Sequence, residues 1–447
     1  MSRWAQFLDR LQSYGSRTCL EDANAVYSYA QLLERMTLWQ SRCGENVLRG
    51  SVVGLRADYS IDAVAALLAM LARGACVAMI PRDRDWAHYM RDAHAAVSLE
   101  VETNGEYRWH HIAAPPRHPL VDRLRAADES GLIIFTSGST GRPKAALQAL
   151  ERFLHKYRNP GRCLRTIAFL LFDHVAGLDT LFYTLSSGGT LILTRRRDPL
   201  SIMQLIESHA VEVLPASPSF LRLLCATPAG AHDLSSLKII TYGSEPMDAA
   251  TLARLNRRFG NVQIAQKYGT TETGSPRTMS RGNDSLWVKF KEGVETKVVD
   301  DMLWIRSEGT ILGYLNAESP VDDDGWYCTG DLVDVDGEWL RFRGRATDII
   351  KVGGEKVAPA EVEQTILELD IVREAVVSGE PHPLMGQVVT ARIALSVPLD
   401  AKEAAKIVRA HCRSRLPSFK VPLRVDVATD GFATERQKAQ RRRDAAG

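Results

Sequence analysis

Apolar runs of strand length alternate with amphipathic patterns of helix length from about residue 25 to residue 270. Strands are expected at 167–172, 189–193 and 238–241, and helices at 203–208 and 246–259. Such alternation is typical of βαβ units around parallel strands. We therefore predict an α/β fold, and 447 residues are enough for two or more domains.

The chain changes character after residue 270. Strands are expected at 294–299, 302–305, 375–378 and 390–395, followed by a helix at 401–415. The last hundred residues thus predict a small α+β domain, and the glycine-flanked charged link at 345–348 suits a hinge. We predict a large N-terminal domain of β-sheets packed with helices over 1–344 and a small mobile C-terminal domain over 349–447.

Bulk composition excludes several classes of partner. Lys+Arg (56) nearly balance Asp+Glu (54), which gives no reason to expect binding to nucleic acid or to an anionic membrane.

The seven cysteines form no C-x-x-C pair, so neither a zinc site nor a disulfide framework is expected, and a cytoplasmic location is the simple inference. The N-terminal residues 1–9 lack the apolar h-region of a signal peptide, so no signal peptide is expected. The most apolar stretch, 61–81, contains Asp62 and Arg73 and predicts a buried helix and strand instead of a membrane span.

A loop rich in glycine, serine and threonine follows an apolar strand-like run at residues 131–135. The loop residues expected to face an anion are Thr136, Ser137, Gly138, Ser139, Thr140, Gly141 and Lys144. Backbone N–H groups, hydroxyls and one lysine suit a polyphosphate, although a flexible polar turn is the alternative. Lys144 is followed by Ala145 instead of Ser or Thr, so the segment is not a Walker A loop.

This loop resembles the phosphate loop of the adenylate-forming superfamily, which includes acyl- and aryl-CoA synthetases, adenylation domains of peptide synthetases, and luciferases. Further blocks resemble that superfamily in order along most of the chain. They are residues 71–75 with Pro81, then 172–177, 242–246, 268–272, 329–331, 344–345, 351–357 and 359–363. The resemblance implies that ATP and an acid bind between a large and a small domain.

The resemblance also implies the nucleotide contacts. The loop of residues 136–144 would hold the β- and γ-phosphates, and Gly243, Ser244 and Glu245 would pass near the adenine. Tyr268 would stack on the adenine, with Gly269 and Thr270 in the same loop, and Thr271 would contact the α-phosphate. Asp331 would accept hydrogen bonds from the ribose hydroxyls, with Arg345 close to the same sugar.

Each of these roles has a structural alternative. Ser244 or Glu245 could cap a helix that begins at Pro246, and Asp331 could belong to an ordinary Gly-Asp turn. The resemblance makes Glu272 the ligand of Mg²⁺. Since Mg²⁺ usually needs only one or two carboxylates plus phosphate oxygens, a carboxylate cluster is not required.

The C-terminal block departs from the superfamily pattern. There a lysine bridges the carboxylate and the α-phosphate, and Lys438 takes that role by resemblance. Thr434, Lys438 and Arg441 keep the spacing, but Gln437 replaces a glycine and Phe432 a proline, which alters the expected turn. The alternative is a basic solvated tail.

The resemblance further implies a rotation of the small domain after adenylation. The face that carries Lys351, a second catalytic residue by resemblance, would replace Lys438 over the site and line a thiol tunnel. Gly353 and Gly354 would let a pantetheine arm approach the backbone closely. Thr347 stands where relatives often carry Asp or Lys, but hinge roles depend more on backbone freedom than on side chains.

The expected acid pocket consists of Phe172, Asp173, His174, Ala176 and Gly177. By resemblance, His174 gates the tunnel and flanks the acid; the alternative is a hydrogen-bonded structural histidine. Asp173 could pair with the ammonium group of an α-amino acid, or it could simply cap or orient a turn.

These features predict an ATP-dependent ligase that joins an acid to a thiol. It would form an acyl-AMP and pyrophosphate, and then acylate the pantetheine thiol of coenzyme A or of an acyl carrier protein, with ATP and Mg²⁺ as cofactors. A stand-alone amino-acid adenylation enzyme that loads a carrier protein, and a catalytically impaired nucleotide-binding homologue, are the alternatives. A kinase is disfavoured, since neither a Walker A loop nor a kinase catalytic-loop signature is present.

Overall fold

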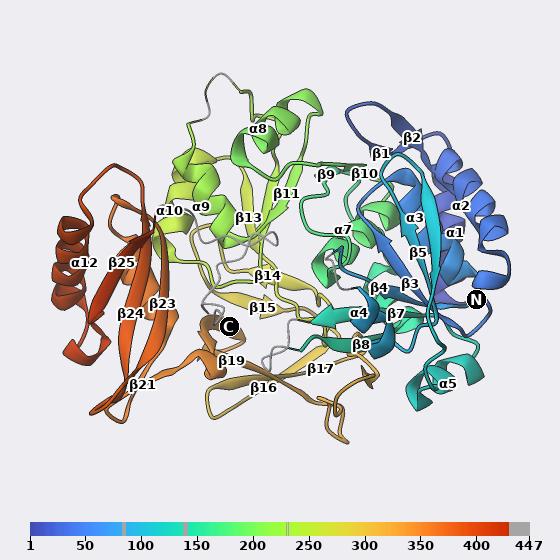
Figure 1. Cartoon of the computed structure of the whole chain (residues 1–447). Helices are drawn as coiled ribbons and strands as arrows, with labels where there is room; N and C mark the ends of the chain where they lie inside the picture. The colour runs from blue at the N-terminus through green and yellow to red at the C-terminus, as the bar shows by residue number, and fades with distance from the viewer. Residues whose placement is uncertain (83–85, 137–141, 229, 231, 429–447) are drawn as a thin grey trace.

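Three β-sheets build the large N-terminal part of the protein and a fourth builds the small C-terminal part (Figure 1). The computed structural model describes residues 1–82, 86–136, 142–228, 230 and 232–428. The predicted fold class, a large α/β domain with a small α+β domain, is confirmed. The boundaries at residues 344 and 349 stay a prediction.

The first sheet has the strand order β13-β12-β11-β9-β10-β1-β2. Its strands are β1 (Thr18–Glu21), β2 (Val26–Ser28), β9 (Arg165–Ile167), β10 (Thr190–Ile192), β11 (Val213–Ala216), β12 (Ile239–Tyr242) and β13 (Gln263–Gln266). Neighbouring strands are parallel apart from the β1–β2 hairpin. The carboxyl ends of β9, β11, β12 and β13 therefore meet at one edge of the sheet.

The second sheet has the order β18-β8-β7-β4-β3-β5-β6. Its strands are β3 (Val52–Ala57), β4 (Cys76–Met79), β5 (Val97–Val101), β6 (Tyr107–His111), β7 (Gly131–Thr136), β8 (Lys144–Ala149) and β18 (Gly313–Tyr314). Its centre, β7-β4-β3-β5, is parallel, and antiparallel strands close both sides.

Helices form layers between and outside these two sheets. One core packs α1 (Arg3–Tyr14), α2 (Tyr29–Cys43), α3 (Ile61–Ala72) and α7 (Val175–Ser186) between the sheets. The outer face of the first sheet is covered by α8 (Pro199–Ser208), α9 (Pro218–Ala226) and α10 (Ala249–Arg258), and that of the second by α4 (Ala87–Asp92) and α5 (Pro119–Ala126). Helix α6 (Leu150–Leu154) follows β8. Almost all of α3 is buried, which explains why its sequence is apolar on every side.

The third sheet is antiparallel, in the order β14-β15-β20-β19-β17-β16. Its strands are β14 (Thr278–Ser280), β15 (Val288–Phe290), β16 (Val294–Val299), β17 (Met302–Ser307), β19 (Tyr327–Asp336) and β20 (Trp339–Arg345). The short helix η3 (Ala346–Asp348) leads from β20 to the small domain.

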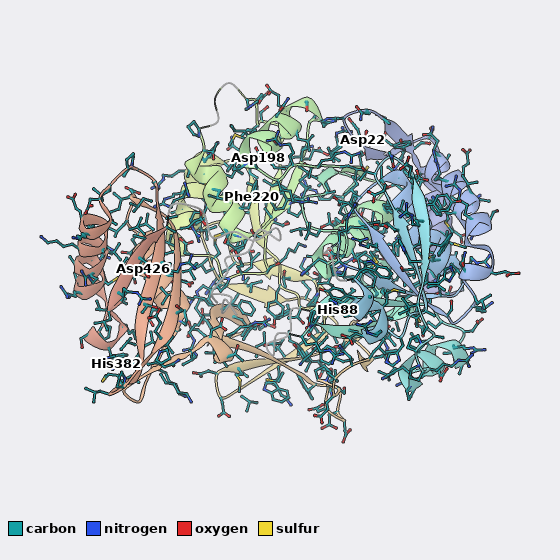
Figure 2. The ribbon with its side chains drawn as sticks, in the orientation of Figure 1. Asp22, His88, Asp198, Phe220, His382 and Asp426 are labelled. Carbon is teal, nitrogen blue, oxygen red and sulfur yellow. The ribbon has the colours of Figure 1, made fainter. Side chains whose placement is uncertain are left out.

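The small domain packs two helices on its own sheet. The elements are β21 (Ile350–Val352), β22 (Glu355–Val357), α11 (Pro359–Leu367), β23 (Val372–His382), β24 (Gly386–Leu395), α12 (Ala401–Arg415) and β25 (Arg424–Ala428). Helix α12 lies on its outer side, and His382 lies at the far end of the β23–β24 hairpin (Figures 1 and 2). Arg254 of α10 donates to the carbonyl of Leu367 at 3.3 Å and so links the two domains.

Most expected elements are present. The strands expected at 302–305, 375–378 and 390–395 are longer than expected, and three further bounds need correction. The strand expected at 167–172 ends at Ile167, apart from one further bond from the Ala168 N–H to the carbonyl of Ile192. The rest of the apolar run leaves the sheet and fills the core with Phe169 and Phe172. The helix expected at 246–259 begins at Ala249, after the N-cap Asp248, so neither Ser244 nor Glu245 caps it. The helix expected at 203–208 already begins at Pro199.

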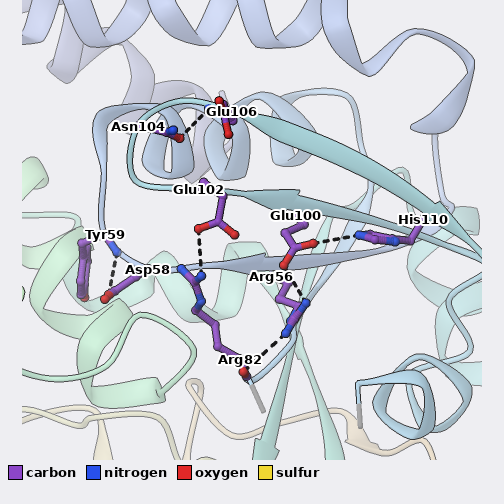
Figure 3. A network of polar contacts seen from close by, with 9 residues as sticks. All are labelled: Arg56, Asp58, Tyr59, Arg82, Glu100, Glu102, Asn104, Glu106 and His110. Atoms are coloured by element: carbon purple, nitrogen blue, oxygen red, sulfur yellow. Dashed lines mark hydrogen bonds and ion pairs between the residues drawn. The ribbon is translucent and has the colours of Figure 1, made fainter. Parts of the chain in front are cut away.

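Polar side chains cross-link the edge of the second sheet (Figure 3). Arg56 donates to Glu100 at 2.6 Å, and the other oxygen of Glu100 lies 2.9 Å from Nε2 of His110. Arg82 pairs with Glu102 at 2.9 Å. These contacts join β3, β5 and β6 near the carboxyl ends of the parallel strands β3 and β5.

Two expectations from composition are tested by the structure. All seven cysteines are free, as predicted. Within the described residues, every helix is too short or too polar to cross a lipid bilayer.

Asp248 is expected to contribute strongly to stability. Its carboxylate accepts from the N–H of Thr251 at 2.7 Å and from Arg222 at 2.7 Å, and both charged residues are buried. Burial alone would raise the pKa of Asp248, but Arg222 and the helix cap lower it, so this stability is present above the ordinary aspartate pKa and is lost as pH falls below it. Asp248→Ala should cost about 3–5 kcal/mol in urea unfolding, since it leaves a buried guanidinium unpaired.

A matched substitution separates the buried pair from the helix cap. Asp198 caps α8 through the N–H of Ser201 at 3.0 Å, and its side chain is partly exposed. Figure 2 labels this residue. Asp198→Ala should cost only about 1 kcal/mol. Equal losses for the two variants would contradict the role given to the Arg222 pair.

Candidate active site

A cavity of about 860 Å³ lies at the carboxyl ends of β7, β12 and β13. Ligand sites of open α/β sheets form outside the carboxyl ends of the strands. Side chains from α7 and from the loops after β12 and β13 line it. A second cavity of about 590 Å³ lies between the latter loops and α11 of the small domain. The large cavity is thus the candidate site, and the second one connects it to the C-terminal part.

One wall of the cavity is the β7–β8 hairpin. Thr136 at the end of β7 pairs with Lys144 at the start of β8, and both residues line the cavity. The predicted loop residues Ser137, Gly138, Ser139, Thr140 and Gly141 lie outside the described residues. Nζ of Lys144 lies 5.0 Å from the ring centroid of Tyr314, and no carboxylate among the described residues pairs with it. This lysine therefore offers its positive charge to the cavity.

Glu272 is a buried carboxylate that lines the same cavity. Its residue is 7% exposed, and Oε1 accepts from the Tyr314 hydroxyl at 2.5 Å. Thr270 and Thr273 exchange hydrogen bonds of 3.2 Å and hold the turn, and Thr271 is buried beside Glu272. Within the described part of the chain, no group of three His, Cys, Asp or Glu side chains is placed for a metal ion. A cation in this cavity would therefore rest on Glu272 and on oxygens of the substrate.

Tyr268, Asp331 and Arg345 form a connected group. The Tyr268 hydroxyl donates to Oδ2 of Asp331 at 2.7 Å, and Nε of Arg345 donates to Oδ1 at 3.2 Å. The Tyr268 ring is stacked on Phe342, with centroids 4.7 Å apart. Burial raises the pKa of Asp331, and Arg345 and Tyr268 oppose that shift. The carboxylate of Asp331 thus joins Arg345 to Tyr268, which lies 63 positions earlier in the sequence than Asp331.

The loop after β12 runs close to the loop after β13. A Cβ added at Gly243 would lie 2.6 Å from the carbonyl of Lys267, so this close approach requires glycine. Ser244 has φ +72°, and Glu245 accepts from the hydroxyl of Ser219 at 2.7 Å. Gly243 and Ser244 line both cavities, whereas Glu245 lines the second.

Gly269 also belongs to a tight turn. An added Cβ would lie 2.5 Å from the carbonyl of Gly274. Gly269 and Thr270 line the cavity beside Tyr268 and Thr271. The structure therefore brings together all the described residues that the sequence assigned to the nucleotide, apart from Glu245 and Asp331, which lie on the side of the second cavity.

The expected acid-pocket residues divide into two groups. His174 and Ala176, at the start of α7, line the cavity. Phe172 and Gly177 belong to the core instead: Phe172 packs on the ring of Tyr59, whose hydroxyl donates to the carbonyl of Gly177 at 2.8 Å. Asp173 is not among the described lining residues of either cavity and acts electrostatically on Tyr59.

Several charged residues that line the cavity were not predicted from the sequence: Lys156, Arg162, Asp179, Lys267, Arg277 and Lys291. Helical spacing offers a signal for Asp179: Ala176, Asp179, Thr180 and Tyr183 lie three or four residues apart on one face of α7. Lys267 directly precedes the block that begins at Tyr268. For Lys156 and Arg277, sequence spacing contains no such signal.

The residues predicted for the thiol step lie elsewhere. Lys351 is on β21, and Gly353 and Gly354 form the turn to β22 with φ of +58° and +93°. Two successive positive φ values are typical of a two-residue hairpin turn, which accounts for both glycines without a tunnel. None of the three lines either cavity in the described chain, and Lys438 lies outside the described residues.

Tyr314 is expected to position Glu272. Tyr314→Phe keeps the buried ring next to Lys144 but removes the donor to the carboxylate. If Glu272 holds a divalent cation, activity should fall by about tenfold, with a higher Mg²⁺ concentration needed for half-maximal rate. Steady-state assays across a Mg²⁺ titration measure this. A Tyr183→Phe control changes a partly exposed tyrosine of α7 that also lines the cavity but does not contact Glu272 in the described structure. It should leave the Mg²⁺ dependence unchanged.

Comparison with known sequences gives two matching families. The family described as AMP-binding enzyme matches residues 7–315, and the AMP-binding enzyme C-terminal domain matches residues 361–438. A methyl-dioxo-octahydroindenyl-propanoyl:CoA ligase of Mycobacterium tuberculosis is 32% identical over 313 residues, which are 65% of this chain. The match spans 61% of that ligase, less than two thirds of its length. A fatty acid–[acyl-carrier-protein] ligase of Mycobacterium marinum is 29% identical over 72% of this chain and 69% of its own.

Comparison with solved structures gives the same fold. The anthranilate CoA ligase AuaEII in complex with anthranoyl-AMP superimposes with a TM-score of 0.83 and 21% identity, over 97% of this chain and 95% of that one. At that identity the likeness shows the architecture only.

Proposed function

Because the chain belongs to the AMP-binding enzyme family, as its resemblance to adenylate-forming enzymes predicts, we propose that it activates a carboxylic acid with ATP and passes the acyl group to a thiol. The first step would form an acyl-AMP and release pyrophosphate. The second would acylate the pantetheine thiol of coenzyme A or of an acyl carrier protein. Named ligases of both kinds are among its relatives.

The observation that carries this proposal is the shared placement of Thr136, Lys144, Glu272 and Tyr268 around one cavity at the strand ends. A lysine that has no carboxylate partner among the described residues suits phosphate, and a buried carboxylate in the same cavity suits a cation. Tyr268, held by Asp331, suits a nucleoside. Joining two anions requires that negative charge be screened and the reacting oxygen be placed in line with phosphorus.

The residues would divide the work as follows. Lys144 and Thr136 would bind the phosphates, Tyr268 and Gly243 would flank the adenine, and Asp331 with Arg345 would bind the ribose. Thr271 would contact the α-phosphate. Glu272 would hold Mg²⁺, and the ion would neutralise phosphate charge.

The second half of the reaction is assigned to the small domain. Lys438 would orient the carboxylate against the α-phosphate in the first step. Rotation about residues 345–348, which separate a domain of residues 1–344 from one of 349–447, would then bring Lys351 and the Gly353–Gly354 turn toward the cavity. His174 would move or be displaced as the thiol enters.

The residues that line the cavity favour an acid substrate that has no ammonium group. Asp173, the residue expected to pair with an α-amino group, is not among the described lining residues. Asp179 does line the cavity, but it already forms an ion pair with Lys156. The ammonium group of an amino-acid substrate would therefore compete with Lys156 for the carboxylate of Asp179.

Exchange of labelled pyrophosphate into ATP tests the proposal. The full-length protein should catalyse exchange that depends on added acid and on Mg²⁺, with aryl and fatty acids preferred over amino acids. Mass spectrometry after addition of coenzyme A, or of a phosphopantetheinylated carrier protein, identifies the acceptor. ATP hydrolysis without exchange, or no acid dependence, would contradict the assignment.

A further inference from the structure

We propose that the acid substrate carries a second carboxylate, which binds among Lys156, Lys267 and Arg277 beside α7. This inference rests on the proposed function and narrows its substrate to dicarboxylic acids. Three elements bring the cations together: the short helix η2 (His155–Tyr157), the loop after β13, and the segment before β14. All three residues line the large cavity.

Lys156 is the innermost of the three cations. Its side chain is 13% exposed, and Nζ donates to the carbonyl of Ser275 at 2.6 Å. It also forms an ion pair with Asp179, whose Oδ1 accepts from the Tyr157 hydroxyl at 2.6 Å. An ammonium group has three N–H donors, and these contacts use two. Within the described residues this leaves one N–H of Lys156 for a ligand in the cavity.

The other two cations have no acidic partner in the part of the chain that the structure describes. Arg277 donates to the carbonyls of Lys156 at 2.5 Å and Asn159 at 3.4 Å, and neither it nor Lys267 pairs with a carboxylate among the described residues. Burial lowers the pKa of Lys156, Asp179 opposes that shift, and Lys267 and Arg277 lower the pKa further. Three cations thus act on one another in a cavity whose described lining contains two carboxylates, Asp179 and Glu272. Asp179 pairs with Lys156, and Glu272 accepts from Tyr314.

Such a cluster favours an anion over an apolar group. Like charges close together disfavour their own ionised forms, and an added negative charge relieves that repulsion. A carboxylate would accept charge-assisted hydrogen bonds from the unused N–H of Lys156 and from the cations at its rim. A purely apolar acyl tail would instead displace water from these cations. It would offer no acceptor to replace the hydrogen bonds that the water had formed. Arg162 and Lys291 also line the cavity and extend its positive rim.

Matched pairs of acids test the inference in the pyrophosphate-exchange assay without any thiol. Benzoate is compared with the three benzenedicarboxylates, and hexanoate with adipate. At least one diacid should exceed its monoacid about tenfold or more in kcat/KM. Lys267→Met and Arg277→Met should each reduce that ratio severalfold. Lys156→Met should remove the preference, and the two rim variants keep the test valid if this buried substitution prevents folding.

Lys238→Met is the matched control. Lys238 is exposed, pairs with Glu212 and lies outside the cavity lining, so the diacid preference should not change. Equal or better exchange with the monoacids would overturn the inference and leave the ligase proposal intact. Rim variants that alter only the KM for coenzyme A would also overturn it, because the cluster would then serve the thiol donor. Exchange with none of the acids would overturn both.

Discussion

Lys438→Ala should reduce acid-dependent pyrophosphate exchange by about 100- to 1,000-fold. The proposed role of this lysine is to neutralise charge between two anions as the acyl-phosphate bond forms, and alanine supplies no charge. Formation of thioester from supplied acyl-adenylate should be largely retained, because that step begins after Lys438 has completed its role. Exchange and single-turnover thioester assays on the same preparations measure the two halves.

The control distinguishes one positioned lysine from a generally basic tail. Arg436→Ala removes a positive charge two residues away in the same segment and should leave exchange nearly unchanged. If the two variants lose the same activity, or if Lys438→Ala retains exchange, the segment does not have the role that the spacing of Thr434, Lys438 and Arg441 predicts. Gln437→Gly and Phe432→Pro would then be the first substitutions to test, because the superfamily pattern has a glycine and a proline at these two positions.

Glu272→Gln should reduce exchange by about 100-fold or more and raise the Mg²⁺ concentration required. Glutamine keeps the size of the side chain and an oxygen that can accept from Tyr314, so the buried turn should persist. What it removes is the negative charge that would hold the cation. A titration of Mg²⁺ at saturating ATP separates weaker metal binding from a slower reaction.

Glu338→Gln is the control for that loss of charge. Glu338 is exposed in the β19–β20 turn, outside both cavities, and its substitution should change neither rate nor Mg²⁺ dependence. Unfolding by urea should be similar for both variants. A Glu272→Gln enzyme with wild-type Mg²⁺ dependence would contradict the metal role, and a large loss of stability would instead make Glu272 a structural residue.

Local elements followed closely from local sequence. The strand Val294–Val299 and the helix Ala401–Arg415 have the bounds that their patterns predict. Side chains within a few residues determine such elements, as the capping contact of Asp400 with the N–H of Lys402 at 2.9 Å illustrates. The strand expected at 167–172 was placed wrongly because its end is not determined by local sequence. Apolar composition predicts burial, but only neighbouring strands decide where hydrogen-bonded pairing ends.

The sequence by itself determined the fold class, the order of the superfamily-like blocks and most of the candidate nucleotide residues, because each is encoded by residues close together in the chain. Only the tertiary structure decided which distant side chains meet. It joined Tyr268 to Asp331, set Tyr314 against Glu272, and placed Lys156 between Asp179 and Ser275. It also moved Phe172 and Gly177 from the expected pocket into the core. Each of these contacts joins residues that are more than 20, and in some cases more than 100, positions apart. They depend on how sheets and helices pack together, and no local spacing specifies that packing.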